Sequence, residues 1–597
     1  MKSRVAVPAV LAVLGVLALS RAASAQSLTP AEEAGFEATP SYSETLDYLR
    51  QLQPRLPEMH LGTFGTSGQG RPMPLVVVSK EKAFTASKAR SLGKPIVLIQ
   101  SGIHAGEIDG KDATLMILRD MAAGKHQDLL DAMTLVFIPI YNVDGHERVS
   151  PYNRPNQDGP RRGMGFRTTA EGLDLNRDHV KLASEEARAL MALVHEWRPH
   201  LHVDNHVTDG VDHDWVLTYA AAEAPQAPAP VAAWLRTHLT AALAATGKAG
   251  FPSGPYVDLK ERSDPSKGFS SWVGQPRFSS GFFPLLNRPS ILVETHSYKP
   301  YKQRVLATQA FLLSLLAEVA KDPAALPRAV ADAEAATVAQ GKPDAPPSDL
   351  VLIWGESDKP DRIRFPVYAS ENRPSVVSGQ PLLRYRRGEV AEIEVPWYHT
   401  SVVAKAVPRP RGYLVLPGWS AVEQRLRWHG LRVEKLQKPA ELEVEVTRVG
   451  NPKLAPFPYQ GMVQVTGADI EHRKEKRSLP AGTLWIPADQ PDFELAAQLL
   501  EPEAPDSLFA WGLLSSVFEQ KEYIDSGVLE DKAREMLKDP ATAAAWQQAL
   551  QDEKFAADAF SRYLWWYRRT PYWDDTIGLL PIFRVTQAPA FATAPWQ

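Results

Sequence analysis

Between about residues 60 and 320, short apolar runs alternate with segments of helical periodicity. Strands that alternate with helices form a largely parallel sheet, because each helix carries the chain back across one face of that sheet. We therefore predict an α/β fold in which a mostly parallel sheet has helices on both faces. The strands are expected at residues 75–78, 95–100, 135–139, 201–205, 215–218 and 290–294, and the helices at 111–123, 184–197, 230–246 and 302–321.

Polar side chains stand at or just beyond the ends of three predicted strands. His104 and Glu107 follow one strand, His206 follows another, and Glu294 ends a third. The C-terminal ends of parallel strands share one edge of a sheet, which is where ligands bind. Two histidines and one glutamate form the ligand set of a catalytic zinc and leave a position open for water. The chain has no cysteine, so any metal site must use His, Asp and Glu.

Several other histidines lie close to these motifs. His202 shares one face of its strand with His206, and we interpret it as a residue packed under the end of the sheet. His179, His213 and His296 also lie close to motifs, and His296 is interpreted as a polar residue of a loop. An H-x-x-E pair alone is common in sequences, so the metal-site prediction depends on the complete set of strand-end residues.

Four short motifs follow one another in a recognisable order. They are "HAGE" at 104–107, "LNR" at 175–177, "DNH" at 204–206 and "VET" at 293–295. Together they resemble the zinc carboxypeptidase family, the carboxypeptidase A-like metallopeptidases. The segment "YNVDGHE" at 141–147 also resembles that family's N-P-D-G segment. The resemblance covers roughly residues 40–320.

The resemblance implies a metal centre and a catalytic base. His104, Glu107 and His206 would bind one zinc ion per chain. Glu294 would act as the general base and later as the proton donor, because it is a carboxylate outside the ligand set. Asp174 matches a position whose carboxylate could orient a ligating histidine.

The resemblance also implies groups that bind the substrate. Asn176 and Arg177 would hold a substrate carboxylate, with the arginine acting as a two-pronged donor. Arg167 would stabilise the oxyanion that develops during hydrolysis, with Arg161 and Arg162 as alternatives.

One part of the family pattern is missing. The family has a tyrosine about twenty residues before its base, and here that stretch contains Trp272 and no tyrosine. Tyr256 lies further upstream, away from the expected place. Ser279 and Ser280 stand where the family sets side-chain specificity, and they supply no acid that would attract a basic side chain.

The N-terminus carries a different signal. Residues 1–4 are basic, residues 5–19 are apolar, and Ala23-Ser-Ala25 is a small-x-small cleavage pattern. Fifteen apolar residues are short for a membrane span. We therefore predict a cleaved signal peptide at 1–25 and a periplasmic or secreted location. The formal net charge of −4 indicates no nucleic-acid surface.

The rest of the chain is expected to form further domains, because 597 residues exceed one compact core. The catalytic domain is predicted at 26–325, a linker at 326–349, a β-rich accessory domain at 350–490 and a helical segment at 491–597.

These observations predict an exported zinc metallocarboxypeptidase whose partner is a peptide or small amide substrate, without nucleic acid and without a membrane after signal cleavage. Two alternatives stay open. The site could serve a zinc amidohydrolase or deacylase acting on small N-acyl amino acids or cell-wall peptides. The chain could also be an inactive peptide-binding module.

Overall fold

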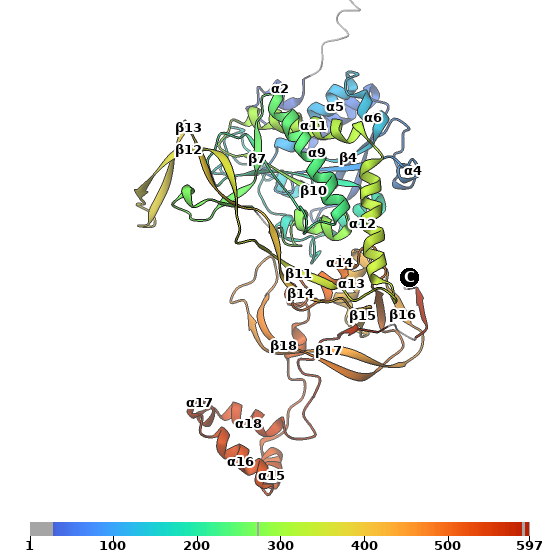
Figure 1. Ribbon diagram of the computed structural model, residues 1–597, viewed down its shortest axis with the longest axis vertical. Helices are drawn as coiled ribbons and strands as arrows, with labels where there is room; N and C mark the ends of the chain where they lie inside the picture. Colours follow the sequence, from blue (N-terminus) through green and yellow to red (C-terminus); the bar gives the residue numbers. More distant parts are fainter. Residues whose placement is uncertain (1–27, 272–273, 588–590, 596–597) are drawn as a thin grey trace, which may run out of the picture. The chain divides into compact units, whose positions relative to one another are not determined.

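The computed structural model describes residues 28–271, 274–587 and 591–595 (Figure 1). Its contacts divide the chain into two compact units. The first contains residues up to 409 together with 423–433 and 487–506, and the second contains 410–422, 434–486 and the residues from 507 onward. The predicted signal peptide lies outside the described residues. Within them, no helix has both the length and the apolar character needed to cross a membrane.

An eight-stranded mixed sheet forms the centre of the first unit. Its strand order is β1-β2-β4-β3-β5-β10-β6-β7, and the neighbours from β4 through β3 and β5 to β10 are parallel. Strands β3, β4 and β10 are buried along their whole length, as parallel strands covered on both faces must be. The strands are β1 (Met59–Thr66), β2 (Pro72–Val78), β3 (Ile96–Ser101), β4 (Thr134–Ile138), β5 (Leu201–Thr208), β6 (Leu217–Ala221), β7 (Ser253–Pro255) and β10 (Ser290–His296).

Helices cover this sheet, which confirms the predicted α/β class. Helices α9 and α11 lie side by side along it (Figure 1), and apolar residues of both belong to the same large core as the strands. The helices are α2 (Pro30–Glu33), α3 (Tyr42–Leu52), α4 (Ala86–Ser91), α5 (Asp109–Ala122), α6 (Gln127–Ala132), α7 (Val143–His146), α8 (Glu185–Trp197), α9 (Ala229–Lys248), α10 (Ser279–Phe282), α11 (Tyr301–Lys321) and α12 (Ala325–Gly341).

The segment predicted as a linker, 326–349, is helical along most of its length. Helix α12 occupies it, and Leu326, Val330 and Ala333 of this helix are buried in the main core. The composition of this stretch indicated a helix that runs into a linker. The helix extends to Gly341, and its apolar residues recur at helical spacing and contact α9.

A long hairpin also belongs to the first unit, although the sequence placed it in a separate accessory domain. Its strands, β12 (Asp361–Pro374) and β13 (Pro381–Tyr398), form a four-stranded sheet with β9 (Phe269–Ser271) and β8 (Val257–Leu259). Phe365 and Val395 of the hairpin share a hydrophobic cluster with Phe269. The burial of these apolar groups joins the hairpin to the first unit. Strands β11 (Asp349–Glu356) and β14 (Ser401–Pro408) pair beside it, and α14 (Phe493–Leu500) completes this unit.

The second unit combines a seven-stranded sheet with four helices. The strand order is β18-β17-β20-β15-β19-β16-β21. Its elements are β15 (Gly412–Val415), β16 (Glu434–Leu436), β17 (Ala440–Leu454), β18 (Val465–Leu479), β19 (Leu484–Pro487), β20 (Ile582–Val585) and β21 (Thr593–Pro595), with α15 (Ser526–Met536), α16 (Pro540–Ala549), α17 (Glu553–Ala557) and α18 (Ala559–Tyr567). Helix α13 (Ser420–Trp428) spans the boundary between the units in sequence. The predicted helical segment therefore ends in strands, because β20 pairs with β15.

The hydrophobic cluster of the hairpin generates a stability prediction. Phe365 is fully buried, and its ring stacks on Phe269 with ring centroids 4.3 Å apart. Phe365→Ala should lower the free energy of unfolding by about 3–5 kcal/mol, because it leaves a cavity. Urea unfolding measures the change. Val376→Ala, at the fully exposed tip of the same hairpin, is the control and should leave the midpoint unchanged. Equal midpoints for both variants would show that the cluster does not anchor the hairpin.

Candidate metal and catalytic centre

Strand register brings the predicted site residues to one edge of the sheet. In the parallel pair of β10 and β5, Glu294 lies directly beside His206. In the pair of β3 and β5, Ser101 lies beside Asn205, so the turn that follows β3 begins next to His206. That turn carries His104 and Glu107 and is closed by a hydrogen bond from the Glu107 amide to the His104 carbonyl.

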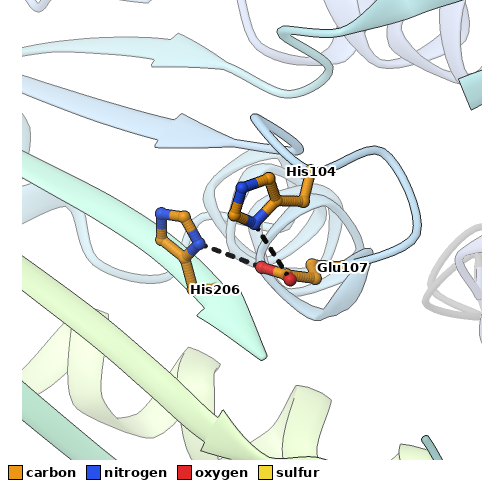
Figure 2. A group of neighbouring side chains, drawn as sticks. All are labelled: His104, Glu107 and His206. Atoms are coloured by element: carbon orange, nitrogen blue, oxygen red, sulfur yellow. Dashed lines mark hydrogen bonds and ion pairs between the residues drawn. The ribbon is translucent and has the colours of Figure 1, made fainter. Parts of the chain in front are cut away.

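The Glu107 carboxylate faces both histidines (Figure 2). Its Oε1 is 3.0 Å from Nδ1 of His104, and its Oε2 is 2.9 Å from Nδ1 of His206. All three side chains are buried. Each can offer one ligand atom, and these three atoms lie within 4.8 Å of one another.

The outer nitrogen of each histidine faces a further buried carboxylate. Nε2 of His104 lies 3.1 Å from Oδ1 of Asp174, and Nε2 of His206 lies 3.0 Å from Oδ2 of Asp204. A carboxylate behind a ligating histidine selects the tautomer that carries its proton on the outer nitrogen.

This arrangement tests whether the residues fit a metal ion. If both histidines are neutral and carry their protons on Nε2, as metal ligation requires, the lone pairs of both Nδ1 atoms point at the oxygens of Glu107. Lone pairs that face each other at these distances repel, unless a cation or a proton lies between them. Two imidazoles and one carboxylate are a ligand set that zinc prefers. The donor set therefore fits a zinc ion.

The carboxylates around the centre are stabilised as anions. Burial would raise the pKa of Glu107, but the charges of His104 and Arg154 outweigh it and hold that pKa well below its usual range. Burial is likewise outweighed at Asp174 by His104, and at Asp204 by His206, so both of these pKa values are lowered. Ionised carboxylates around the histidines favour a divalent cation at their centre.

Glu294 has the opposite electrostatic character. It is buried, and its Oε2 has no hydrogen-bond partner among the residues described. Burial raises its pKa to about 8, and the attraction of His206 only partly opposes this effect. A carboxyl group poised near neutral pH is suited to accept and return a proton. A bound divalent cation would lower this pKa, because it favours the ionised form.

Glycines let the segment that carries Arg167 pass close to the metal-binding turn. A Cβ atom at Gly106 would lie 2.7 Å from the carbonyl oxygen of Gly165, and one at Gly165 would lie 2.7 Å from the carbonyl oxygen of Ala105. Neither approach leaves room for a side chain. The close contact brings Arg167 to Asp174, whose Oδ2 accepts hydrogen bonds from this guanidinium at 3.0 Å and 2.9 Å.

The two other arginines proposed for the oxyanion lie elsewhere. Arg161 extends into solvent and pairs with Glu37 at 3.6 Å. Arg162 is exposed, and neither residue lines the catalytic cavity, whereas Arg167 does. The structure therefore favours Arg167 for this position.

The predicted carboxylate-binding pair stands at the same cavity. Asn176 and Arg177 belong to a short 3-10 helix, Leu175–Arg177, and the Asn176 amide donates to Asp174 Oδ1 at 2.9 Å. The Arg177 guanidinium lies over the ring of Phe278, 4.3 Å from its centroid, and donates to the Asn176 carbonyl at 2.8 Å. These contacts orient the guanidinium before a ligand arrives.

One cavity of about 520 Å³ unites these groups. Its lining includes the residues predicted to bind the metal and the substrate carboxylate, the predicted base and Arg167, together with residues that the motifs did not indicate. The full set is His104, Glu107, Asn153, Arg154, Pro155, Asn156, Gln157, Phe166, Arg167, Asn176, Arg177, His206, Val207, Thr208, Asp209, Tyr256, Phe278, Leu292, Glu294 and Ser297.

Arg154 and Tyr256 are the most important additions. Nη2 of Arg154 lies 2.8 Å from Oε1 of Glu107 and donates to the Val207 carbonyl at 2.9 Å. Arg154 stands in a proline-containing loop that does not follow a predicted strand, so no motif indicated it. Tyr256 lines the same cavity as Glu294. Burial raises the pKa of Tyr256, and the charge of Glu294 raises it further. Sequence distance alone placed this tyrosine too far upstream.

The other histidines do not join the centre. His202 packs under the sheet, where its ring stacks on Phe283 with centroids 3.9 Å apart and burial lowers its pKa to about 3. His213 and His296 contact each other edge to face with centroids 4.6 Å apart. Trp272 lies outside the described residues.

Known proteins share sequence similarity with this chain. The sequence profile of the family described as zinc carboxypeptidase matches residues 45–207. Carboxypeptidase 2 of Trichophyton rubrum is 24% identical over 467 residues, which are 75% of this chain and 79% of the relative. Carboxypeptidase 2 of Trichophyton tonsurans is 25% identical over 471 residues, with the same coverage of 75% and 79%. A metallo-carboxypeptidase structure from Burkholderia cenocepacia aligns over 47% of this chain and 69% of its own, with 18% identity and a TM-score of 0.35. The family assignment rests on the sequence matches.

The raised pKa of Glu294 predicts a pH-dependent stability of the metal-free protein. A folded-state pKa of about 8 against 4.5 for the free group means that the folded chain binds the proton more tightly. Glu294 should therefore destabilise the fold progressively as pH rises from about 4.5 to 8. The melting temperature of chelator-treated Glu294→Gln, minus that of the wild type, should increase across this range. A difference that stays constant with pH would contradict a buried, proton-binding Glu294.

Proposed function

Because this chain belongs to the zinc carboxypeptidase family, we propose that it hydrolyses C-terminal peptide bonds with one zinc ion bound by His104, Glu107 and His206. The observation that carries the proposal is the convergence of these three side chains, Glu294 and Arg177 on one cavity. Zinc in such a site acidifies a water molecule and polarises a carbonyl group.

Glu294 is the proton-transfer group of the proposed reaction. As a carboxylate it accepts a proton from the attacking water, and as the acid it returns this proton to the amine that leaves. Its buried position beside His206 keeps bulk water away from this exchange. The absence of a hydrogen-bond partner at Oε2 among the described residues leaves that atom available for the water.

Two arginines divide the substrate contacts. Arg167 is held by Asp174 at the cavity wall, where its guanidinium can stabilise negative charge on the carbonyl oxygen. Arg177 and Asn176 bind the terminal carboxylate of the substrate, so that the bond next to the C-terminus reaches the base. This anchoring makes the proposed activity an exopeptidase activity.

Export is also part of the proposal. It rests on the basic, apolar and small-residue pattern of residues 1–25 and on the absence of cysteine, and it places the enzyme in the periplasm or outside the cell.

The metal and base assignments make separable predictions. His206→Ala should lose zinc, because it removes one of three ligands, and elemental analysis of the purified protein measures the loss. Glu294→Gln should keep zinc at the level of the wild type and lose hydrolysis by a factor of about 10³ or more. Full zinc retention in His206→Ala would remove this histidine from the ligand set, and normal hydrolysis by Glu294→Gln would remove that residue as the base.

The role of Arg177 predicts a requirement for a free C-terminus. Two peptides are compared that differ only in whether the C-terminus is free or amidated. The enzyme should release terminal residues from the free form alone, and a zinc chelator should stop this release. Mass spectrometry detects the products. Arg177→Met should reduce the rate on the free peptide toward that on the amidated one, because the carboxylate loses its charged partner.

If the zinc-loaded protein leaves both peptides intact, the carboxypeptidase proposal is wrong. Hydrolysis of small N-acyl amino acids in the same assay would then identify a deacylase.

A further inference from the structure

A second cavity lies beside the catalytic one, and the two share Tyr256 as a wall. Its volume is about 140 Å³, which is room for one side chain and well below the size of a pocket for a larger ligand. Its lining comes from β6, the loop after β6, the end of β7, β9 and the turn between β13 and β14, and comprises Tyr219, Ala220, Ala221, Glu223, Ala224, Gln226, Pro255, Tyr256, Ser271, Trp397, His399, Thr400 and Ser401.

Trp397 is the best-fixed wall of this cavity. It pairs with Phe269 where β13 runs parallel to β9, so the sheet sets its position. Its indole N–H donates to Ser271 Oγ at 2.9 Å. The imidazole of His399 stacks on the indole with ring centroids 3.9 Å apart and is itself held by Asp361 at 2.7 Å. An aromatic ring held at its edge and on one face is preorganised to receive a ligand.

The charge of the cavity wall is negative. Glu223 lines the cavity from the solvent-exposed loop after β6, and its carboxylate forms no hydrogen bond or ion pair with the other described side chains. Tyr219 lines the same cavity as Glu223, and burial together with this carboxylate raises the pKa of Tyr219 to about 12. Neither lysine nor arginine lines the cavity among the residues that the structure describes. Three aromatic rings with one carboxylate favour a cation, because ring faces and carboxylates both attract positive charge.

We propose that this second cavity binds the cationic side chain of a lysine or arginine residue next to the scissile bond, and that Trp397 and Glu223 are specificity-determining residues. The inference rests on the proposed peptidase function and names its substrate class. It requires the β12–β13 hairpin to be part of the catalytic unit, which its pairing with β9 provides.

The position expected to set specificity is not suited to this task. Ser279 is buried and donates its hydroxyl hydrogen bond to Asp204 at 2.6 Å, so it supports the carboxylate behind His206. It offers no charge to a substrate. Selection of a cationic side chain therefore comes from Trp397 near the end of β13 and Glu223 in the loop after β6.

Matched peptides test the proposal. One pair of peptides has lysine or its uncharged analogue norleucine at the last position, and a second pair has them at the penultimate position. The kcat/KM values are compared within each pair. The zinc-loaded wild type should prefer lysine over norleucine by about tenfold or more at one of these positions, the preference that 1.4 kcal/mol supplies. Glu223→Gln and Trp397→Leu should each bring the ratio close to one through a loss on the lysine peptide.

The control is Glu33→Gln, which removes an exposed carboxylate from α2 and should keep the wild-type ratio. Equal rates for lysine and norleucine in the wild type, or a preference that survives both variants, would overturn the inference while the peptidase function stands.

If the protein hydrolyses none of these peptides, the proposed function is wrong. Peptide binding then tests the role of the second cavity. Calorimetry on the same zinc-loaded protein then compares the two peptides. Tighter binding of the lysine peptide that is lost in Glu223→Gln supports the inference, and equal affinities overturn it.

Discussion

The contact of the Glu107 carboxylate with two histidines is the interaction on which the rest of the centre depends. Each histidine presents Nδ1 to one oxygen of this carboxylate and turns Nε2 toward another acid, Asp174 or Asp204. Nitrogen lone pairs and buried carboxylates repel one another, so it is costly to bring them together without a cation. The donor set therefore fits a divalent metal ion, whose charge would offset this cost.

The charge of this centre separates two kinds of glutamate. Glu107 stays ionised because His104 and Arg154 oppose the effect of burial, whereas burial prevails at Glu294 and raises its pKa. The separation follows from position: Glu107 receives hydrogen-bond partners from several segments, while Glu294 Oε2 has none within the described residues. One carboxyl group is thereby suited to hold a metal and the other to move a proton.

Arg154 and the β12–β13 hairpin extend the site beyond the strand ends. Arg154 crosses Gly106 to reach Glu107, a contact that needs a glycine because a Cβ there would lie 2.9 Å from the arginine Cγ. The hairpin adds Trp397 beside Tyr256, so a segment far along the chain forms a second cavity next to the first. Neither feature has a local pattern, since both depend on loops and sheet pairing over long sequence distances.

The sequence by itself determined the α/β class, the main strands and helices, and which polar residues stand at strand ends, because apolar periodicity and short motifs are local properties. Only the tertiary structure decided that β6 runs antiparallel to β10, that residues 350–409 join the catalytic unit, and that Arg154 and Tyr256 line its cavity. These outcomes depend on which surfaces bury each other and on strand register. The free energy of such pairing belongs to contacts between distant segments, which no single stretch of sequence contains.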